Sequence, residues 1–332
     1  MPGPPPAVAA TRVAVRRMLA SLPTGTVLVA CSGGPDSMAL AAAVAFEAPR
    51  QGRAAGAVVV DHGLQEDSAA VAAQAADSCL RLGLAPVEVR SVKVATGSGG
   101  PGPEAAARAA RYDALTAAAT DSGAVRVLLG HTRDDQAEQV LLGLARGSGT
   151  RSLAGMPRTR GLFARPLLDL PRAVTTAACA AQDLTVWEDP HNLDRRYARV
   201  RAREAVAATE AALGPGVAAA LARSAGLLAA DAEALDQWAG RVVADLGGSP
   251  WTLATLGPVA ELPVAVRRRV WRMLASAHGS RGGDLSAVHL DALDRLLSDW
   301  RGQGPVSLPG GLSAQRAAGI LRIGPHRPAS SG

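Results

Sequence analysis

The sequence predicts an α/β fold in which a parallel sheet carries helices on both faces, followed by a smaller, mainly helical domain. Three observations support this prediction. Short apolar segments alternate with helix-like segments over roughly the first 190 residues, polar or glycine-rich turns follow the apolar segments directly, and the pattern becomes mostly helical from about residue 197. Alternating strands and helices are typical of parallel sheets, whose ligands bind at the carboxyl ends of the strands.

The strands are predicted from apolar runs or from alternation of apolar and polar residues. Four segments meet this criterion: 26–31, 54–61, 86–94 and 124–129. The segments between them are predicted as helices, the second of which ends on the glycine cap Gly83. These are a helix from about Met38, helices at 66–83, 104–120 and 134–146, and a Gly/Pro loop at 97–103.

The segment Leu213-Gly-Pro-Gly216 separates the two predicted domains, because glycine and proline interrupt helices. The first domain is predicted to span 1–212 and the second 213–325, with a disordered tail at 326–332. In the second domain we expect helices at 217–246, 264–278 and 285–300, followed by a small hairpin formed by 306–312 and 320–323.

Composition predicts a cytoplasmic protein that does not associate with a membrane. The 332 residues are 48% hydrophobic, which suits about two packed domains, yet no apolar run reaches transmembrane length and no secretory signal is visible. Cys31, Cys79 and Cys179 are far apart, which argues against a disulfide framework or a zinc site and fits a reducing compartment. A monomer and a homodimer both remain open.

The charge balance predicts an anionic partner. The net charge is +6, the isoelectric point is about 10.1, and the basic residues are almost all arginine. Arginine matches phosphate geometry and stacks on bases, so nucleic acid is a candidate partner. Compositional bias explains arginine in place of lysine, but it does not explain the clusters at 195–203 and 267–272.

The loop Ser32-Gly33-Gly34-Pro35-Asp36-Ser37 is the strongest functional signal. It joins a predicted strand to a predicted helix, so a helix N-terminus, two glycines and two hydroxyls meet at one anion site. A carboxylate beside phosphates needs a cation, which argues for Mg²⁺ between Asp36 and a polyphosphate. No Gly-Lys-[Ser/Thr] follows, and Lys93 is the only lysine in the sequence, so this is not a Walker A loop. A turn without a ligand is the alternative.

The segment after the fourth strand carries a second group of candidates. His131 follows that strand, and Asp135 and Glu138 lie three residues apart on one face of the next predicted helix. Two carboxylates so placed can hold a primary ammonium group or a metal ion. Helix capping is the alternative, and it accounts for Asp134 but not for His131.

Arginines supply the remaining candidates. Arg111 shares a helical face with Glu104, so it could form an ion pair within the helix. It could instead neutralise charge on a phosphate, and the sequence supports the two roles equally. Further on, Arg195, Arg199 and Arg203 are predicted to share a helical face, where like charges repel. Such a run is typical of a surface that binds a nucleic-acid backbone. A solvated face is the alternative.

The chain resembles the tRNA(Ile)-lysidine synthases over nearly its whole length. The matching segments, in order, are CSGGPDS, VDHGLQEDS, PEAAARAARYDAL, GHTRDDQAEQVLLGLARGSGTRSLAGM, RPLLDLPR and WEDPHNLDRRYARVRAR, with a looser match in HLDALDRLLSDWRGQGPVSLPGG. The first segment marks only the ATP pyrophosphatase superfamily, whereas the fourth and sixth are more specific. The resemblance implies a Rossmann-like catalytic domain of the adenine nucleotide alpha hydrolase type and a tRNA-binding second domain.

The resemblance also implies a reaction and a set of residue roles. These enzymes use ATP to adenylate O2 of the wobble cytidine in the CAU anticodon of a minor isoleucine tRNA, and the ε-amine of free L-lysine then attacks C2 and expels AMP. ATP is expected on the loop, with Mg²⁺ held by Asp36 through phosphates. The lysine ammonium groups are expected near Asp135 and Glu138. The remaining roles are catalysis by Arg111 and His131, and tRNA contacts by Arg195, Arg199, Arg201 and Arg203.

Two positions depart from the family pattern, and two other functions stay open. Thr132 stands where many members have a second histidine, and Gln139 stands where threonine is common. A tRNA thiolase is the alternative enzyme, but Cys79 and Cys179 fall in helix-like segments, which disfavours it. A non-catalytic nucleotide-binding module is the third hypothesis, and it leaves the acidic pair and the arginine run unexplained.

Overall fold

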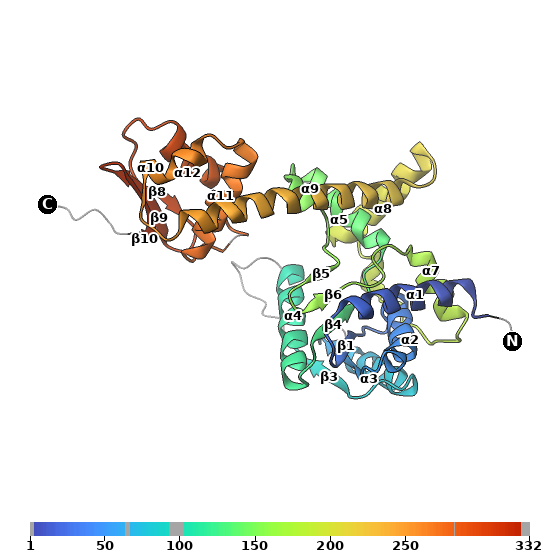
Figure 1. Cartoon of the computed structure of the whole chain (residues 1–332). Coiled ribbons are helices and arrows are strands. Elements are labelled where there is room, and N and C mark those ends of the chain that lie inside the picture. The colour runs from blue at the N-terminus through green and yellow to red at the C-terminus, as the bar shows by residue number, and fades with distance from the viewer. Residues whose placement is uncertain (1–2, 64–66, 93–102, 282, 327–332) are drawn as a thin grey trace. The chain divides into compact units, whose positions relative to one another are not determined.

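The computed structural model describes residues 3–63, 67–92, 103–281 and 283–326. Its internal contacts divide the chain into two units, Met1–Ala229 and Ala230–Gly332, whose helices and strands are drawn in Figure 1. Each unit has its own hydrophobic core. The division falls inside the long helix α9 (Val217–Leu246). The break expected after Leu213 is the turn between α8 (Ala198–Leu213) and α9, where Gly214 adopts a φ of 96°.

A six-stranded sheet forms the centre of the first unit, in the order β3-β2-β1-β4-β6-β5. Its strands are β1 (Val27–Ala30), β2 (Ala55–Asp61), β3 (Val87–Ser91), β4 (Arg126–Leu129), β5 (Thr159–Arg160) and β6 (Phe163–Ala164). Among the described strands of this sheet, β5 and β6 pair antiparallel and the other pairs are parallel, so the predicted parallel sheet is confirmed. The four predicted strands are present, and β5 and β6 are additions too short to show alternation.

Helices cover both faces of this sheet, as predicted. Val27 and Val29 of β1 belong to a core with α1 (Pro6–Ser21), α2 (Pro35–Arg50), α3 (Ser68–Arg81) and α7 (Arg172–Ala180). Leu28 and Ala30, which alternate with them, belong to a separate core with α4 (Pro103–Asp121). The first unit also contains α5 (Arg133–Ala145), α6 (Thr150–Leu153) and the 3-10 helix η1 (Pro190–Leu193). The predicted Gly/Pro loop at 97–103 lies almost wholly outside the described residues.

From β1, the chain builds the sheet outward in one direction through β2 and β3, and it then returns to place β4 on the other side of β1. In such sheets, ligands bind in a crevice at the carboxyl ends of the strands where this change of direction occurs. Gly130 directly follows β4 at this point. A Cβ atom on Gly130 would lie 3.0 Å from the backbone carbonyl carbon and oxygen of Asp36. Glycine at this position therefore lets the end of β4 approach the start of α2 closely.

The second unit combines helices with an antiparallel sheet in the order β7-β10-β9-β8. Its elements besides α9 are β7 (Trp251–Thr252), α10 (Leu253–Ala260), α11 (Val264–Ala277), α12 (Ala287–Ser298), β8 (Val306–Leu308), β9 (Leu312–Ala317) and β10 (Ile320–Pro325). The predicted hairpin is thus part of a larger sheet, whose shortest strands carry too few residues for a sequence pattern. Of the predicted disordered tail, His326 donates its backbone N–H to Gly311 at 2.8 Å, and 327–332 lie outside the described residues.

The arginine run at 267–269 is engaged in ion pairs within this unit. Arg267 pairs with Asp294 at 2.8 Å, Arg268 with Asp291 at 2.6 Å, and Arg269 with Asp236 at 2.9 Å. The basic patch predicted there is therefore largely neutralised by neighbouring carboxylates.

Candidate active site

The hydroxyl group of Ser37 holds the loop between β1 and α2 in shape. It accepts the backbone N–H of Ser32 at 3.1 Å and donates to the carbonyl of Gly34 at 2.9 Å. Gly33 has a φ of 81°, a conformation that favours glycine, and its carbonyl accepts the backbone N–H of Trp187 at 2.9 Å. The predicted anion-binding loop is therefore a preformed turn at the N-terminus of α2.

A cavity of about 310 Å³ opens beside this loop. The polar residues that line it are Ser32, Asp61, His62, Ser68, Arg111, Asp189, His191 and Asn192, and its apolar wall includes Val58, Val59 and Trp187. An anion-binding helix N-terminus next to an apolar wall suits a nucleotide, which has a phosphate chain and a flat base. None of residues 187–192 was a site candidate in the sequence analysis, although they begin the more specific matching segment WEDPHNLDRRYARVRAR.

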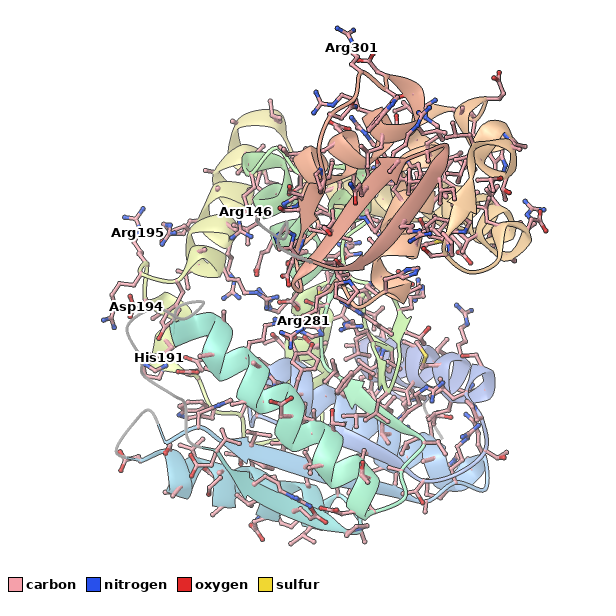
Figure 2. The ribbon with its side chains drawn as sticks, turned by 90° about the vertical axis from the view of Figure 1, so that its left-hand side faces the viewer. Arg146, His191, Asp194, Arg195, Arg281 and Arg301 are labelled. Atoms are coloured by element: carbon pink, nitrogen blue, oxygen red, sulfur yellow. The ribbon has the colours of Figure 1, made fainter. Side chains whose placement is uncertain are left out.

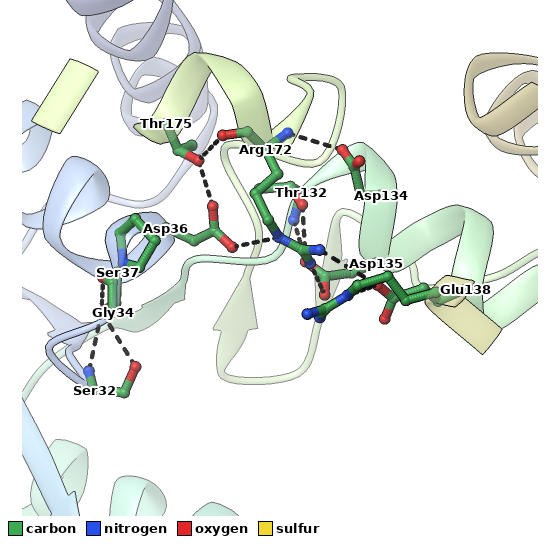
Figure 3. Close-up of polar contacts among 12 residues, drawn as sticks. Ser32, Gly34, Asp36, Ser37, Thr132, Asp134, Asp135, Glu138, Arg172 and Thr175 are labelled. Carbon is green, nitrogen blue, oxygen red and sulfur yellow. Dashed lines mark hydrogen bonds and ion pairs between the residues drawn. The ribbon is translucent and has the colours of Figure 1, made fainter. Parts of the chain in front are cut away.

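Three carboxylates converge on Arg172, the first residue of α7 (Figure 3). Its Nε atom lies 3.2 Å from Oδ2 of Asp36, its Nη2 atom 2.9 Å from Oδ1 of Asp135, and its Nη1 atom 3.4 Å from Oε1 of Glu138. The hydroxyl of Thr175 donates to the other oxygen of Asp36. The predicted metal-binding carboxylate and the predicted ammonium-binding pair thus lie around one guanidinium group.

The charges of this cluster depend on one another. Burial raises the pKa of the Asp36 carboxyl, although Thr175 and Arg172 oppose the rise. Burial also acts to raise the pKa of Asp135, but Arg172 holds it below its usual value. Conversely, burial acts to lower the pKa of Arg172, and the three carboxylates hold it above its usual value. Arg172 is therefore a permanent cation that keeps Asp135 ionised.

The first turn of α5 uses its two aspartates differently from what was expected. Oδ2 of Asp135 accepts both the backbone N–H of Thr132 at 2.8 Å and its hydroxyl at 3.0 Å. Asp134 instead accepts the backbone N–H of Arg172 at 2.8 Å and so fixes the start of α7. The prediction that Asp134 caps its own helix is wrong, because Asp135 is the residue that reaches back to the N-cap.

A second cavity, of about 200 Å³, adjoins the first and shares His62 and Arg111 with it. Its other lining residues are Ala107, Arg108, Tyr112, Leu129, His131 and Arg199. The Nδ1 atoms of His62 and His131 are buried, and neither has a hydrogen-bond partner among the residues that the structure describes. Two predicted catalytic residues, Arg111 and His131, therefore line one cavity.

His131 is uncharged at neutral pH. Burial lowers the pKa of its imidazole to about 3, and Arg165, Arg199 and Arg111 act in the same direction against Asp135. A neutral imidazole can donate one hydrogen bond and accept one. The ring lines the second cavity, although its Nδ1 atom is buried.

The predicted arginine face is only partly confirmed. Helix α8 begins at Ala198, so Arg195 lies outside it and the expected helical face shared by Arg195 and Arg199 is wrong. The cause is Asp194, whose side chain accepts the backbone N–H of Arg196 at 2.9 Å and forms a turn there. Figure 2 shows Arg195 extending outward from this segment. It pairs with Glu204 at 3.0 Å.

Two other arginines of the run have partners inside the protein. Arg201 donates to the carbonyls of Arg195 and Arg196 at 2.7 and 2.8 Å. Arg203 donates to Oε1 of Glu138 at 2.9 Å and therefore joins the acidic cluster. Contacts of all four predicted arginines with tRNA stay predictions.

Arg172 and Thr175 are functional candidates that the sequence analysis missed. A signal was present, because a cation in the first turn of a helix opposes the helix dipole. Residues that are unfavourable for the local structure often belong to a functional site. The unfavourable position of Arg172 could be recognised only once α7 was known to begin at this residue.

Comparison with known proteins decides the family. Residues 9–210 match the PP-loop domain, and residues 255–322 match the TilS substrate binding domain. A tRNA(Ile)-lysidine synthase of Thermobifida fusca is 53% identical over 325 residues, which cover 97% of this chain and 99% of that protein. The chain belongs to the tRNA(Ile)-lysidine synthase family. The synthase of Salinispora arenicola is 55% identical, and the match covers 96% of this chain and 96% of that protein. The synthase of Streptomyces coelicolor is 51% identical, and the match covers 97% of this chain and 99% of that protein.

Family membership confirms the predicted enzyme class: a PP-loop ligase that binds ATP and modifies tRNA. The U34-tRNA thiolase NcsA from Methanococcus maripaludis with its [4Fe-4S] cluster has a similar structure, with a TM-score of 0.55 and 18% identity over 67% of this chain and 80% of that one. At this identity the likeness confirms only the fold.

No single helix of the described chain has the length and apolarity to cross a membrane. One bent pair of helices, α8 with α9, has the required length and apolar composition when the two are taken together.

Proposed function

We propose that this tRNA(Ile)-lysidine synthase joins L-lysine to C2 of the wobble cytidine in the CAU anticodon of a minor isoleucine tRNA, and that ATP is converted to AMP and pyrophosphate. The lysidine formed would change codon reading from AUG to AUA and tRNA identity from methionine to isoleucine. The observation that carries the proposal is that the acidic cluster and both cavities lie at the carboxyl edge of one sheet. A nucleotide, a base and an amine could then be held together.

In the first step, O2 of the cytosine attacks the α-phosphorus of ATP, an O–P bond forms, and the bond to pyrophosphate breaks. Arg111 lines both cavities, so its guanidinium can neutralise charge that develops on the phosphate between them. The neutral imidazole of His131 would orient the cytosine by a hydrogen bond. Because the pKa of His131 is about 3, we do not assign this residue the role of general base.

The residues at the loop fit a magnesium ion. Asp36 offers one carboxylate, and burial raises the pKa of that carboxylate, a cost that a bound cation would offset. Magnesium typically takes one or two carboxylates and completes its shell with phosphate oxygens and water. Held there, the ion would supply charge neutralisation to the phosphates during adenylation.

In the second step, the ε-ammonium group of lysine loses a proton to solvent, and the neutral amine attacks C2. A C–N bond forms, AMP leaves with the electrons of the C–O bond, and the nitrogen of the new bond releases its second proton to solvent. Asp135 and Glu138 would hold the ammonium groups of lysine, since both are buried carboxylates on one helical face.

A tRNA thiolase remains the alternative enzyme. Cys31 lines the first cavity, but Cys79 and Cys179 are buried and line neither cavity, which disfavours a thiolase because reactive thiols need access to their substrate.

The test is an incorporation assay with Mg²⁺, radiolabelled ATP, radiolabelled L-lysine and an isoleucine tRNA transcript with a CAU anticodon. We expect AMP and pyrophosphate release, and lysine bound to this transcript but not to a methionine tRNA with the same anticodon. Asp36→Asn should abolish turnover while tRNA binding by filter retention remains. Absence of lysine from the isoleucine tRNA, with folded protein that binds ATP, would overturn the proposal.

A further inference from the structure

The guanidinium of Arg172 occupies the place where Asp135 and Glu138 would hold an amino group of lysine (Figure 3). We propose that Arg172 is an internal counter-ion that neutralises the cluster in the free protein and is displaced from Asp135 and Glu138 when L-lysine binds. L-lysine and Arg172 thus compete for the same two carboxylates. This inference rests on the proposed function.

The cluster needs a cation whether or not lysine is present. The side chains of Asp135 and Glu138 are only 11% and 3% exposed. Buried carboxylates without a positive partner are strongly unfavourable, so an empty lysine site would destabilise the fold. Arg172 removes that cost by contacting both of them, with Arg203 as a second partner of Glu138 at 2.9 Å.

Arg172 nevertheless leaves hydrogen-bonding capacity in the cluster unused. Its contact with Glu138 is long, at 3.4 Å, and it reaches only Oε1. The Oε2 atom of Glu138 is buried and has no hydrogen-bond partner in the described parts of the chain. A primary ammonium group has three donors that can point in different directions, whereas a guanidinium has a fixed fork. An unused buried acceptor therefore favours an ammonium ligand over the arginine.

The geometry also limits how Arg172 moves away. Its backbone N–H is bound by Asp134 at 2.8 Å, so displacement is confined to the side chain. The Nε atom already contacts Asp36, which lies at the loop that binds the phosphates of ATP. Lysine binding would therefore shift a positive charge toward this loop and strengthen ATP binding, and by reciprocity ATP would strengthen lysine binding.

The proposal is tested by equilibrium dialysis of radiolabelled L-lysine against the full-length protein without tRNA. Arg172→Ala should bind lysine about tenfold more tightly than the unaltered protein, a change of about 1.4 kcal/mol. Guanidinium chloride at low millimolar concentration should weaken lysine binding to Arg172→Ala and leave the unaltered protein unaffected, because only the variant has an open guanidinium position. Arg158→Ala, which removes an exposed partner of Asp169 in the same unit, is the matched control and should change neither result.

Weaker lysine binding by folded Arg172→Ala would overturn the proposal, as would the absence of competition by guanidinium. If Arg172→Ala does not fold, Arg172→Gln decides, because it keeps hydrogen-bond donors but removes the charge that competes with lysine. It should bind lysine more tightly than the unaltered protein, and unchanged or weaker binding would refute competition. The proposed function fails separately, if the unaltered protein does not transfer lysine to tRNA.

Discussion

The Nε atom of Arg172 lies 3.2 Å from Oδ2 of Asp36, although 136 residues separate them in the sequence. This contact joins the loop that follows β1 to the acidic cluster on α5. The loop is the proposed ATP site, and the cluster is the proposed lysine site. Chemistry that depends on both substrates can therefore be examined by changing single residues at or near this junction.

Replacing Arg111 should impair adenylation without affecting the lysine site. Arg111 lines both cavities, whereas the acidic cluster is held by Arg172 and Arg203. Removing a preorganised donor to developing phosphate charge typically costs a factor of about 100 or more in rate. Arg111→Ala should therefore slow single-turnover release of pyrophosphate by about that factor. An equal loss in lysine affinity, measured by dialysis, would contradict this assignment.

The pH dependence of stability should report the buried imidazole of His131. Its pKa is about 3 in the folded protein and about 6.5 when unfolded, so the unfolded state binds more protons between these values. The sign follows: stability is full above pH 6.5 and falls as the pH decreases, by up to about 2 kcal/mol from this group at pH 5. In urea unfolding at pH 7 and 5, His131→Asn should lose less stability than the unaltered protein. Equal losses would show that His131 is accessible to protons in the folded state.

Two arginines of the 195–203 run should give different phenotypes. Arg195 extends outward and pairs with an exposed glutamate, so Arg195→Ala should weaken tRNA binding and reduce its salt dependence by about one counterion. Arg203 contacts Glu138, so Arg203→Ala should weaken tRNA binding and also alter lysine affinity. Filter binding over a salt series and lysine dialysis separate the two effects. Altered lysine affinity in Arg195→Ala would be unexpected.

The glycine after β4 should not tolerate a side chain. The Cβ atom of Gly130→Ala would lie 3.0 Å from backbone atoms of Asp36, so the loop must shift. Overpacking of this kind costs about 1–3 kcal/mol, and the KM for ATP should rise as well. Gly226→Ala is the control, because nothing lies within 4 Å of a Cβ there and alanine favours a helix. Its thermal stability should stay the same or rise slightly.

The sequence predicted those features that depend on neighbours along the chain. The strands β1 to β4, the loop at 32–37 and the acidic pair all follow from local patterns, because parallel strands bring their carboxyl ends to one edge. The role of Arg172 does not, since it depends on contacts with residues far away in the sequence. The start of α8 was misplaced because a single turn at Asp194 outweighed the helical spacing of the arginines. The strands β5 to β7 were too short to leave a pattern.

The shared wall of the two cavities bears on the fate of an activated tRNA. His62 and Arg111 belong to both cavities, so a base in the smaller one and a nucleotide in the larger one would become a single covalent molecule that spans the boundary. Under the proposed function, such a molecule would be held in both cavities at once. The protein would thus retain the adenylated cytidine until the lysine amine breaks its C–O bond to AMP. This retention would protect the adenylated cytidine against hydrolysis.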